Sequence, residues 1–143
     1  MVNQGVSIEI RGIPELKGFL TGKKDDIYNA AVEATKQGLA HVKAEVTQSI
    51  AGNRAETRSV DTGHFMGNIY WQQDGLDGTV YTEIEYAPYL EYGTSRGIKP
   101  RSHFRNTAAR EQDKIVKFYR DEMKKAVEKN RIAGLQAFTN LFK

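Results

Sequence analysis

The triplet Asp61, Thr62 and Gly63 contains the residue types most suggestive of chemistry in this sequence. Asp-Thr-Gly is the sequence with which aspartic proteases activate water between two carboxylates that share one proton. A chain of 143 residues could supply one such aspartate to a symmetric dimer. However, the triplet follows a polar stretch and not a buried apolar strand. A turn in which Asp61 caps the following segment is therefore the simpler interpretation.

The three histidines, His41, His64 and His103, are the other candidates for chemistry. They show no short ligand spacing such as His-x-x-x-His, and the chain has no cysteine to complete a metal site. No serine or threonine forms a recognisable pattern with a histidine and an acid, and no glycine-rich phosphate loop or dinucleotide fingerprint is present. We therefore expect no catalytic residue, no metal and no cofactor, and a protein that is not an enzyme.

These side chains must be positioned by elements that the apolar spacing predicts. Alternating Val, Ile and Ile predict a strand over 6–11, and steps of three and four residues predict a long helix over 24–50. Two further strands, over 68–73 and 79–86, are separated by a turn-forming segment and predict an antiparallel hairpin. A second long helix is expected over 104–129. The order predicts an α+β fold, with a small antiparallel sheet and a central β-hairpin packed against two long helices.

The remaining segments are predicted to be short or irregular. A helical turn is expected over 14–20, a polar loop over 51–62, and an aromatic helical turn over 87–94. Gly134 is expected to end the second long helix, so that 131–143 forms a docking tail of the single domain 1–143. The packed stripe predicted for that helix consists of Ala108, Gln112, Val116, Tyr119, Met123 and Val127.

Composition limits the class of protein. The apolar share is 39%, the charged share is 27% and the length suits one domain, which argues against intrinsic disorder. Without cysteine, the chain can form no disulfide framework. No window approaches the roughly 18 apolar residues that a membrane span needs, and no signal-peptide pattern is present. We expect neither membrane insertion nor classical secretion.

The net charge of +3 is unevenly distributed. Most of the basic excess lies between Tyr92 and Arg110, a stretch without any acid, whose basic residues are Arg96, Lys99, Arg101, Arg105 and Arg110. Such a segment can bind nucleic acid or an acidic protein surface, or it can be a solvated loop that leads into a helix. The sequence leaves these alternatives open.

Tyrosines are concentrated between Tyr70 and Tyr92, which contains five of the seven in the chain. Three of them, Tyr86, Tyr89 and Tyr92, lie within nine residues. Tyrosine is favoured where a surface is buried by a partner yet stays partly wet, but it also anchors turns to the core of its own domain. Both interpretations apply to this cluster.

Three motifs resemble those of a family of minor structural proteins of tailed phages. Residues 61–69 are similar to its Asp-Thr-Gly-x-Leu-x-x-Ser-Ile segment, residues 86–94 to its Tyr-Ala-x-Tyr-x-Glu-x-Gly-Thr signature, and residues 100–108 to its Pro-Arg-Pro-Phe-Leu-Arg-Pro-Ala element. The family comprises the head–tail joining, or tail-completion, proteins of phages with long noncontractile tails. This chain departs from the pattern at His64-Phe65 and Ser102-His103.

The resemblance implies a virion protein made in the host cytoplasm that forms a homo-oligomeric ring at the neck or upper tail. Its partners would be the connector or stopper and the tail-terminator or tail-tube proteins, with contact to DNA in the channel as a further expectation. A ring interface joins two different patches. We assign Tyr89, Glu91, Tyr92, Arg96, Lys99, Arg101 and Phe104 to one patch. Leu135, Phe138 and Phe142, with the loop 51–62, are candidates for the other. The alternative function is a nucleic-acid-binding module that uses the basic loop 96–110.

Overall fold

The computed structural model describes residues 5–12 and 25–140, apart from the side chains of residues 25, 130, 133–135 and 137–139. Its elements follow the order β1 (Val6–Ile10), α2 (Asp25–Ile50), the 3₁₀ helix η1 (Met66–Asn68), β2 (Tyr70–Asp74), β3 (Asp77–Thr82), α3 (Ala87–Tyr92), α4 (His103–Arg110) and α5 (Gln112–Asn140). The predicted α+β fold is confirmed. The helical turn expected over 14–20 lies outside the described residues.

The three described strands form one antiparallel sheet in the order β1-β3-β2. The predicted hairpin joins β2 to β3, and Gly75 begins its tight turn with a φ of +60° that favours glycine. The strand predicted over 79–86 ends four residues early, at Thr82. Thr82 pairs with Val6, the first residue of β1, so the β1–β3 ladder stops there. The backbone then turns, because the Ile84 N–H donates to the Thr82 hydroxyl.

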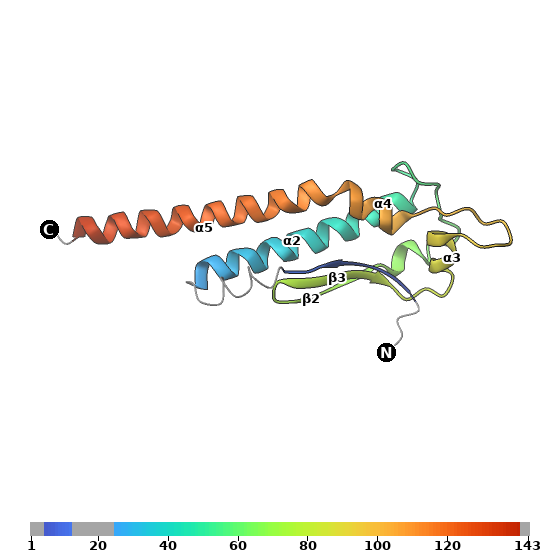
Figure 1. The fold of residues 1–143 in the computed structure, drawn as a ribbon, viewed down its shortest axis with the longest axis horizontal. Coiled ribbons are helices and arrows are strands. Elements are labelled where there is room, and N and C mark those ends of the chain that lie inside the picture. Colours follow the sequence, from blue (N-terminus) through green and yellow to red (C-terminus); the bar gives the residue numbers. More distant parts are fainter. Residues whose placement is uncertain (1–4, 13–24, 141–143) are drawn as a thin grey trace.

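Helix α2 is the centre of the molecule. Figure 1 shows it between the sheet and α5, and it contacts β2, β3, α4 and α5. Its predicted stripe is buried at Ala31, Ala34, Val42, Val46 and Ile50. Burial on two sides requires a partner on each face, which is why so many positions on this helix are small or apolar. The long helix predicted over 24–50 is confirmed.

The second long helix differs from the prediction in three ways. It is broken at Glu111 (φ −100°, ψ 5°) into α4 and α5, and α5 continues through Gly134 to Asn140. The predicted stripe is wrong at Val116 and Val127, which are more than half exposed, whereas Met123 packs against the cluster of Ala31 and Leu76 as predicted. Ile115 and Ala126 face inward in their place.

Polar contacts as well as apolar ones join α5 to α2. The Tyr119 hydroxyl lies 2.5 Å from the Thr35 hydroxyl, and the Gln37 side chain donates to Glu122 at 3.0 Å. Beyond the end of α2, the C-terminal part of α5 extends away from the body of the molecule (Figure 1). None of the described helices is both long and apolar enough to cross a membrane.

Candidate assembly surface and the polar network that supports it

The motif-bearing segment forms an exposed aromatic surface at one end of the molecule. Tyr89 and Tyr92 of α3 are 56% and 58% exposed, and Tyr86 and Ile98 are also exposed. Figure 1 places α3 and the following loop at the end opposite to the C-terminus. We call these four residues the aromatic surface. The structure therefore supports the interpretation that these tyrosines face outward, and a surface of this kind is typical of protein contacts.

The loop that follows α3 is closed by backbone bonds. Thr94 N–H donates to the Ile98 carbonyl at 2.9 Å, and Arg101 N–H donates to the Leu90 carbonyl at 2.7 Å. Gly93 has a φ of +76°, and a Cβ there would lie 2.7 Å from the Ile98 carbonyl oxygen. Glycine is needed at this position for both reasons. The Gly-Thr pair of the motif is thus the point where the loop closes on itself.

Glu91 is not a surface residue, which corrects its assignment to the interface. Its side chain is 2% exposed, and its two oxygens accept from the backbone N–H groups of Phe104 and Arg105 at 2.9 Å each. These N–H groups belong to the first turn of α4, which otherwise lacks intrahelical partners for them. Ser102, at the N-cap, makes no side-chain cap bond, so Glu91 from α3 caps α4 in its place. Phe104 is also buried and is removed from the interface for the same reason.

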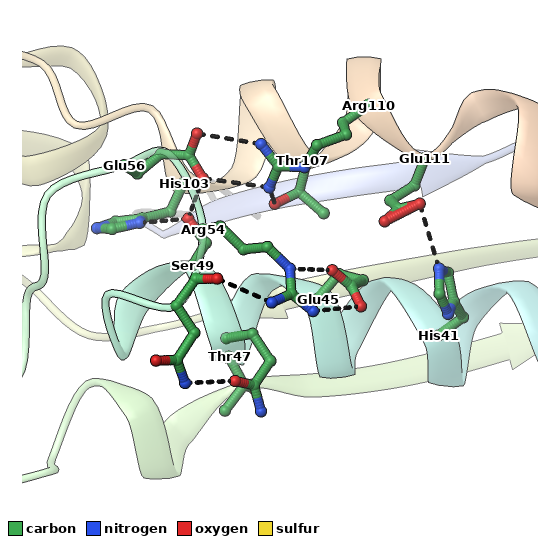
Figure 2. A network of polar contacts seen from close by, with 12 residues as sticks. His41, Glu45, Thr47, Ser49, Arg54, Glu56, His103, Thr107, Arg110 and Glu111 are labelled. Atoms are coloured by element: carbon green, nitrogen blue, oxygen red, sulfur yellow. Dashed lines mark hydrogen bonds and ion pairs between the residues drawn. The ribbon is translucent and has the colours of Figure 1, made fainter.

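The polar loop 51–62 carries a second buried carboxylate, Glu56, which is 8% exposed. It receives hydrogen bonds from the Ser49 hydroxyl at 2.5 Å and from both terminal nitrogens of Arg110 at 3.1 and 3.2 Å (Figure 2). The Asn106 amide also donates to it, at 3.2 Å. Burial raises the pKa of this carboxyl, but the hydrogen bonds outweigh burial and lower the pKa from 4.5 to about 2. Glu56 is therefore ionised at neutral pH, and it ties the loop to α2 and α4.

His103 lies buried between two serine hydroxyls. Its Nδ1 is 2.8 Å from Ser49 Oγ and its Nε2 is 2.7 Å from Ser59 Oγ. Since the Ser49 hydroxyl donates to Glu56, its oxygen accepts from Nδ1–H of the imidazole. Burial lowers the His103 pKa below its usual 6.5, so the ring is neutral at pH 7 and Nε2 accepts from Ser59.

The chain Ser59, His103, Ser49 and Glu56 contains the residue types of a hydrolase triad but not its arrangement. In a triad the acid accepts directly from the histidine and stabilises the imidazolium that forms. In this protein Ser49 intervenes and Arg110 neutralises Glu56. The arrangement is suited to holding the loop in place. No local sequence pattern could reveal it, because Ser49 and His103 are 54 positions apart.

Most cations of the basic stretch are committed to internal contacts. Arg101 donates to Ser59 Oγ and to the Arg58 carbonyl, and Arg105 pairs with Glu91 and lies 4.6 Å from the Tyr92 ring. Arg110 pairs with Glu56, as described above. Only the remaining two, Arg96 and Lys99, are exposed without a partner among the described residues. The basic segment therefore presents two free cations and not five.

A hollow of about 440 Å³ opens between the polar loop and α3. Its lining is mixed polar and apolar and consists of Arg58, Ser59, Val60, Asp61, Thr62, His64, Phe65, Tyr86, Leu90 and Arg101. Asp61 is exposed at this site and follows irregular backbone, whereas the protease interpretation needs a buried aspartate. Asp61 is not the cap of the following element either. Phe65 is the N-cap of η1, which has no side-chain cap bond, so that expectation is wrong.

The apolar tail residues predicted for the second patch have no described side chains. The backbone of Leu135 and Phe138 is part of α5, but their side chains lie outside the described part of the structure. All of Phe142 lies outside it as well. The loop 51–62 is irregular, as expected, and lies near the aromatic surface, joined to it through Arg101. It therefore lies at the same end of the molecule as the aromatic surface.

Compared with known proteins, the sequence matches no protein-family model, no curated protein and no solved structure. The resemblance to the phage family rests on the three motifs in residues 61–108.

Proposed function

We propose that this protein is a structural subunit of the neck or upper tail of a long-tailed phage, which assembles as a ring between the head connector and the tail. The observation that carries the proposal is that the segment with the motif Tyr-Ala-x-Tyr-x-Glu-x-Gly-Thr forms the aromatic surface. Its tyrosines lie on a short helix whose far side is anchored by Glu91. A rigid support reduces the entropy that a contact must overcome.

A ring of identical subunits requires two patches that differ and fit each other. The aromatic surface is the first. We take the second from the outer side of α5, where Val116 and Val127, three turns apart on one face, are each more than half exposed. The two patches lie on different elements, and the free end of α5 points away from the aromatic surface (Figure 1). This separation suits a head-to-tail contact, in which one subunit's aromatic surface meets the next subunit's α5.

The proposed partners above and below the ring are a connector or stopper protein and a tail-terminator or tail-tube protein. Arg96 and Lys99 at the loop tip would face either an acidic surface of one of them or DNA in the channel. Because each subunit adds two cations, a ring multiplies this small charge around one circle. The virion is thus the proposed location of the protein.

A nucleic-acid-binding module is the alternative, and the contacts of the basic stretch weaken it. With two free cations the logarithm of the affinity would fall with the logarithm of salt at a slope of about −2, against about −4 to −5 if all five contacted phosphates. Fluorescence anisotropy with labelled duplex DNA at several salt concentrations measures this slope. A steep slope with tight binding would favour the alternative over the ring.

The direct test of the ring is the mass of the purified protein. Light scattering and native mass spectrometry are run over a range of concentrations, alone and with the proteins that neighbouring genes encode. We expect one discrete assembly of several copies, formed by the chain alone or on a partner. A protein that stays monomeric and binds none of these components would refute the proposal.

Variants locate the contact. Replacing Tyr89 and Tyr92 with serine removes aromatic area from exposed positions, so the fold should persist while assembly weakens by at least tenfold. Tyr70→Ser is the matched control, since Tyr70 is also exposed but lies on β2. Equal assembly of the double variant and the control would remove the aromatic surface from the interface.

A further inference from the structure

A second cluster of titratable side chains lies apart from the aromatic surface, where α2 passes the break between α4 and α5. His41 and Glu45 are one turn apart on α2, and Glu111 is the residue at the break. One ligand atom from each lies within 4.8 Å of the others, and His41 Nε2 is 3.3 Å from Glu111 Oε2. Figure 2 shows the imidazole and this carboxylate pointing toward each other across the two helices.

The environment of the His41 nitrogen is a second observation that points to a ligand. Nε2 is buried, yet it has no hydrogen-bond partner among the described residues. The imidazole as a whole is 23% exposed, and its ring packs edge-on against Phe118 with centroids 5.5 Å apart. Most buried polar atoms are hydrogen-bonded, so a buried nitrogen that lies in ion-pair range of a carboxylate without making a hydrogen bond needs an explanation. A metal ion between the nitrogen and the carboxylate would supply it.

The donor set fits one class of ion. One imidazole nitrogen and two carboxylate oxygens are typical ligands of Zn²⁺, with water in the fourth position. Bond lengths of about 2.0–2.2 Å place tetrahedral ligand atoms about 3.3–3.6 Å apart. The His41–Glu111 pair already has this spacing at 3.3 Å, while the widest separation in the cluster has to close by about 1 Å. Rotation of long glutamate side chains can achieve such a change without moving the helices.

Charge also permits a cation. Arg54 donates to both oxygens of Glu45, at 2.7 and 3.0 Å, and is the positive side chain paired with the cluster. The two glutamates and the arginine together carry a net charge of −1. The guanidinium therefore competes with a metal for Glu45 but does not reverse the sign of the site. Removing the Arg54 guanidinium should therefore strengthen metal binding, so the test includes a variant whose affinity for the metal is expected to rise.

We propose that His41, Glu45 and Glu111 form a binding site for a divalent transition metal ion, with Zn²⁺ as the best fit. The ion would hold the α4–α5 break against α2 and would give the buried Nε2 its partner. The spacing His-x-x-x-Glu escapes a search for paired histidines, and the third ligand is 66 positions farther along the chain. This site is independent of the proposed ring.

The experiment is a zinc titration by calorimetry on the full chain after treatment with a chelator. We expect one Zn²⁺ per chain in the wild type, and binding at least tenfold weaker in His41→Gln and in Glu111→Gln. His64→Gln is the matched control, since His64 is exposed on another loop, and it should bind as the wild type does. Arg54→Met should bind zinc more tightly than the wild type. Circular dichroism of each variant verifies the fold.

Cobalt provides a second readout that depends on geometry. Co²⁺ bound with four ligands of this kind absorbs visible light, and the absorption should vanish in Glu111→Gln. If the wild type takes up no metal, or if both ligand variants bind zinc as tightly as it does, the proposal is overturned. It is also overturned if His64→Gln loses the metal, because binding would then occur elsewhere.

Discussion

Replacing Glu56 with glutamine should reduce the free energy of unfolding by an amount that depends on pH. The folded carboxyl has a pKa of about 2, against 4.5 for an unpaired glutamate. At pH 7 this difference corresponds to about 3 kcal/mol of stability. Glutamine keeps the shape but loses the charge that Arg110 requires, so we expect Glu56→Gln to be about 3 kcal/mol less stable at pH 7.

The sign of the pH dependence follows from the lowered pKa. A group whose pKa is lower in the folded state stabilises the protein above its unfolded pKa, and this contribution is lost as pH falls through the folded pKa. With values of 4.5 and about 2, roughly 2 of the 3 kcal/mol should be lost between pH 7 and pH 3. Glutamine does not titrate, so the gap between the two proteins should narrow to about 1 kcal/mol at pH 3.

Urea unfolding followed by circular dichroism, at both pH values and one protein concentration, measures the gap. Glu85→Gln is the matched control, because Glu85 is exposed and its replacement should change stability by less than about 0.5 kcal/mol. A gap of equal size at pH 7 and pH 3 would refute the reasoning, since it would show that the charge of Glu56 does not stabilise the fold.

Three further predictions concern close contacts and the cap of α4. A Cβ at Gly78 would lie 2.3 Å from a Leu39 methyl, so Gly78→Ala should lower the free energy of unfolding, measured in urea, by about 1–3 kcal/mol. Part of this loss should be recovered when Leu39→Ala is added. If the losses of the two single variants simply add in the double variant, the contact is contradicted. Glu91→Ala removes the cap of α4 and leaves two N–H groups at its N-terminus unpaired. Thermal unfolding should therefore report a loss of stability of about 2 kcal/mol or more. An unchanged melting temperature would exclude the capping role. In Gly93→Ala the new Cβ would be strained by the positive φ and would clash with the Ile98 carbonyl, so we expect a loss of stability of about 1–2 kcal/mol in urea unfolding. An unchanged stability would show that the loop can rearrange.

Elements with a complete local signal could be predicted from the sequence. The α2 stripe repeats every three or four residues over seven turns, so its helix and its buried side follow from spacing alone. The hairpin follows from the turn residues at Gly75 and from alternation on its two strands. In contrast, the break at Glu111 carries neither glycine nor proline, so nothing in the local sequence marks it. Without this break, the exposure of Val116 and Val127 could not be predicted.

The site residues likewise divide into those whose placement the sequence could predict and those whose placement it could not. Exposure of Tyr89 and Tyr92 was compatible with the motif, whereas the burial of Glu91 could not be predicted, since its partners lie 13 and 14 residues later. A glutamate between two exposed tyrosines has the sequence appearance of a surface residue. Its position on a short helix turns it inward to the N-terminus of α4, where backbone N–H groups make an ionised carboxylate favourable.

The basic stretch shows why charges that are clustered in the sequence are not always available to a partner. The acid-free stretch from Tyr92 to Arg110 suggested five cations available to a partner. Two of them are paired with carboxylates from outside the stretch, Glu56 and Glu91, and a third is held by the polar loop. The charge that a partner meets is therefore the pair Arg96 and Lys99 at one loop tip. Two cations are too few for tight binding of DNA by a single chain, but in the proposed ring they would recur in every subunit. The contacts inside one subunit therefore weaken the single-chain DNA-binding alternative to the proposed ring.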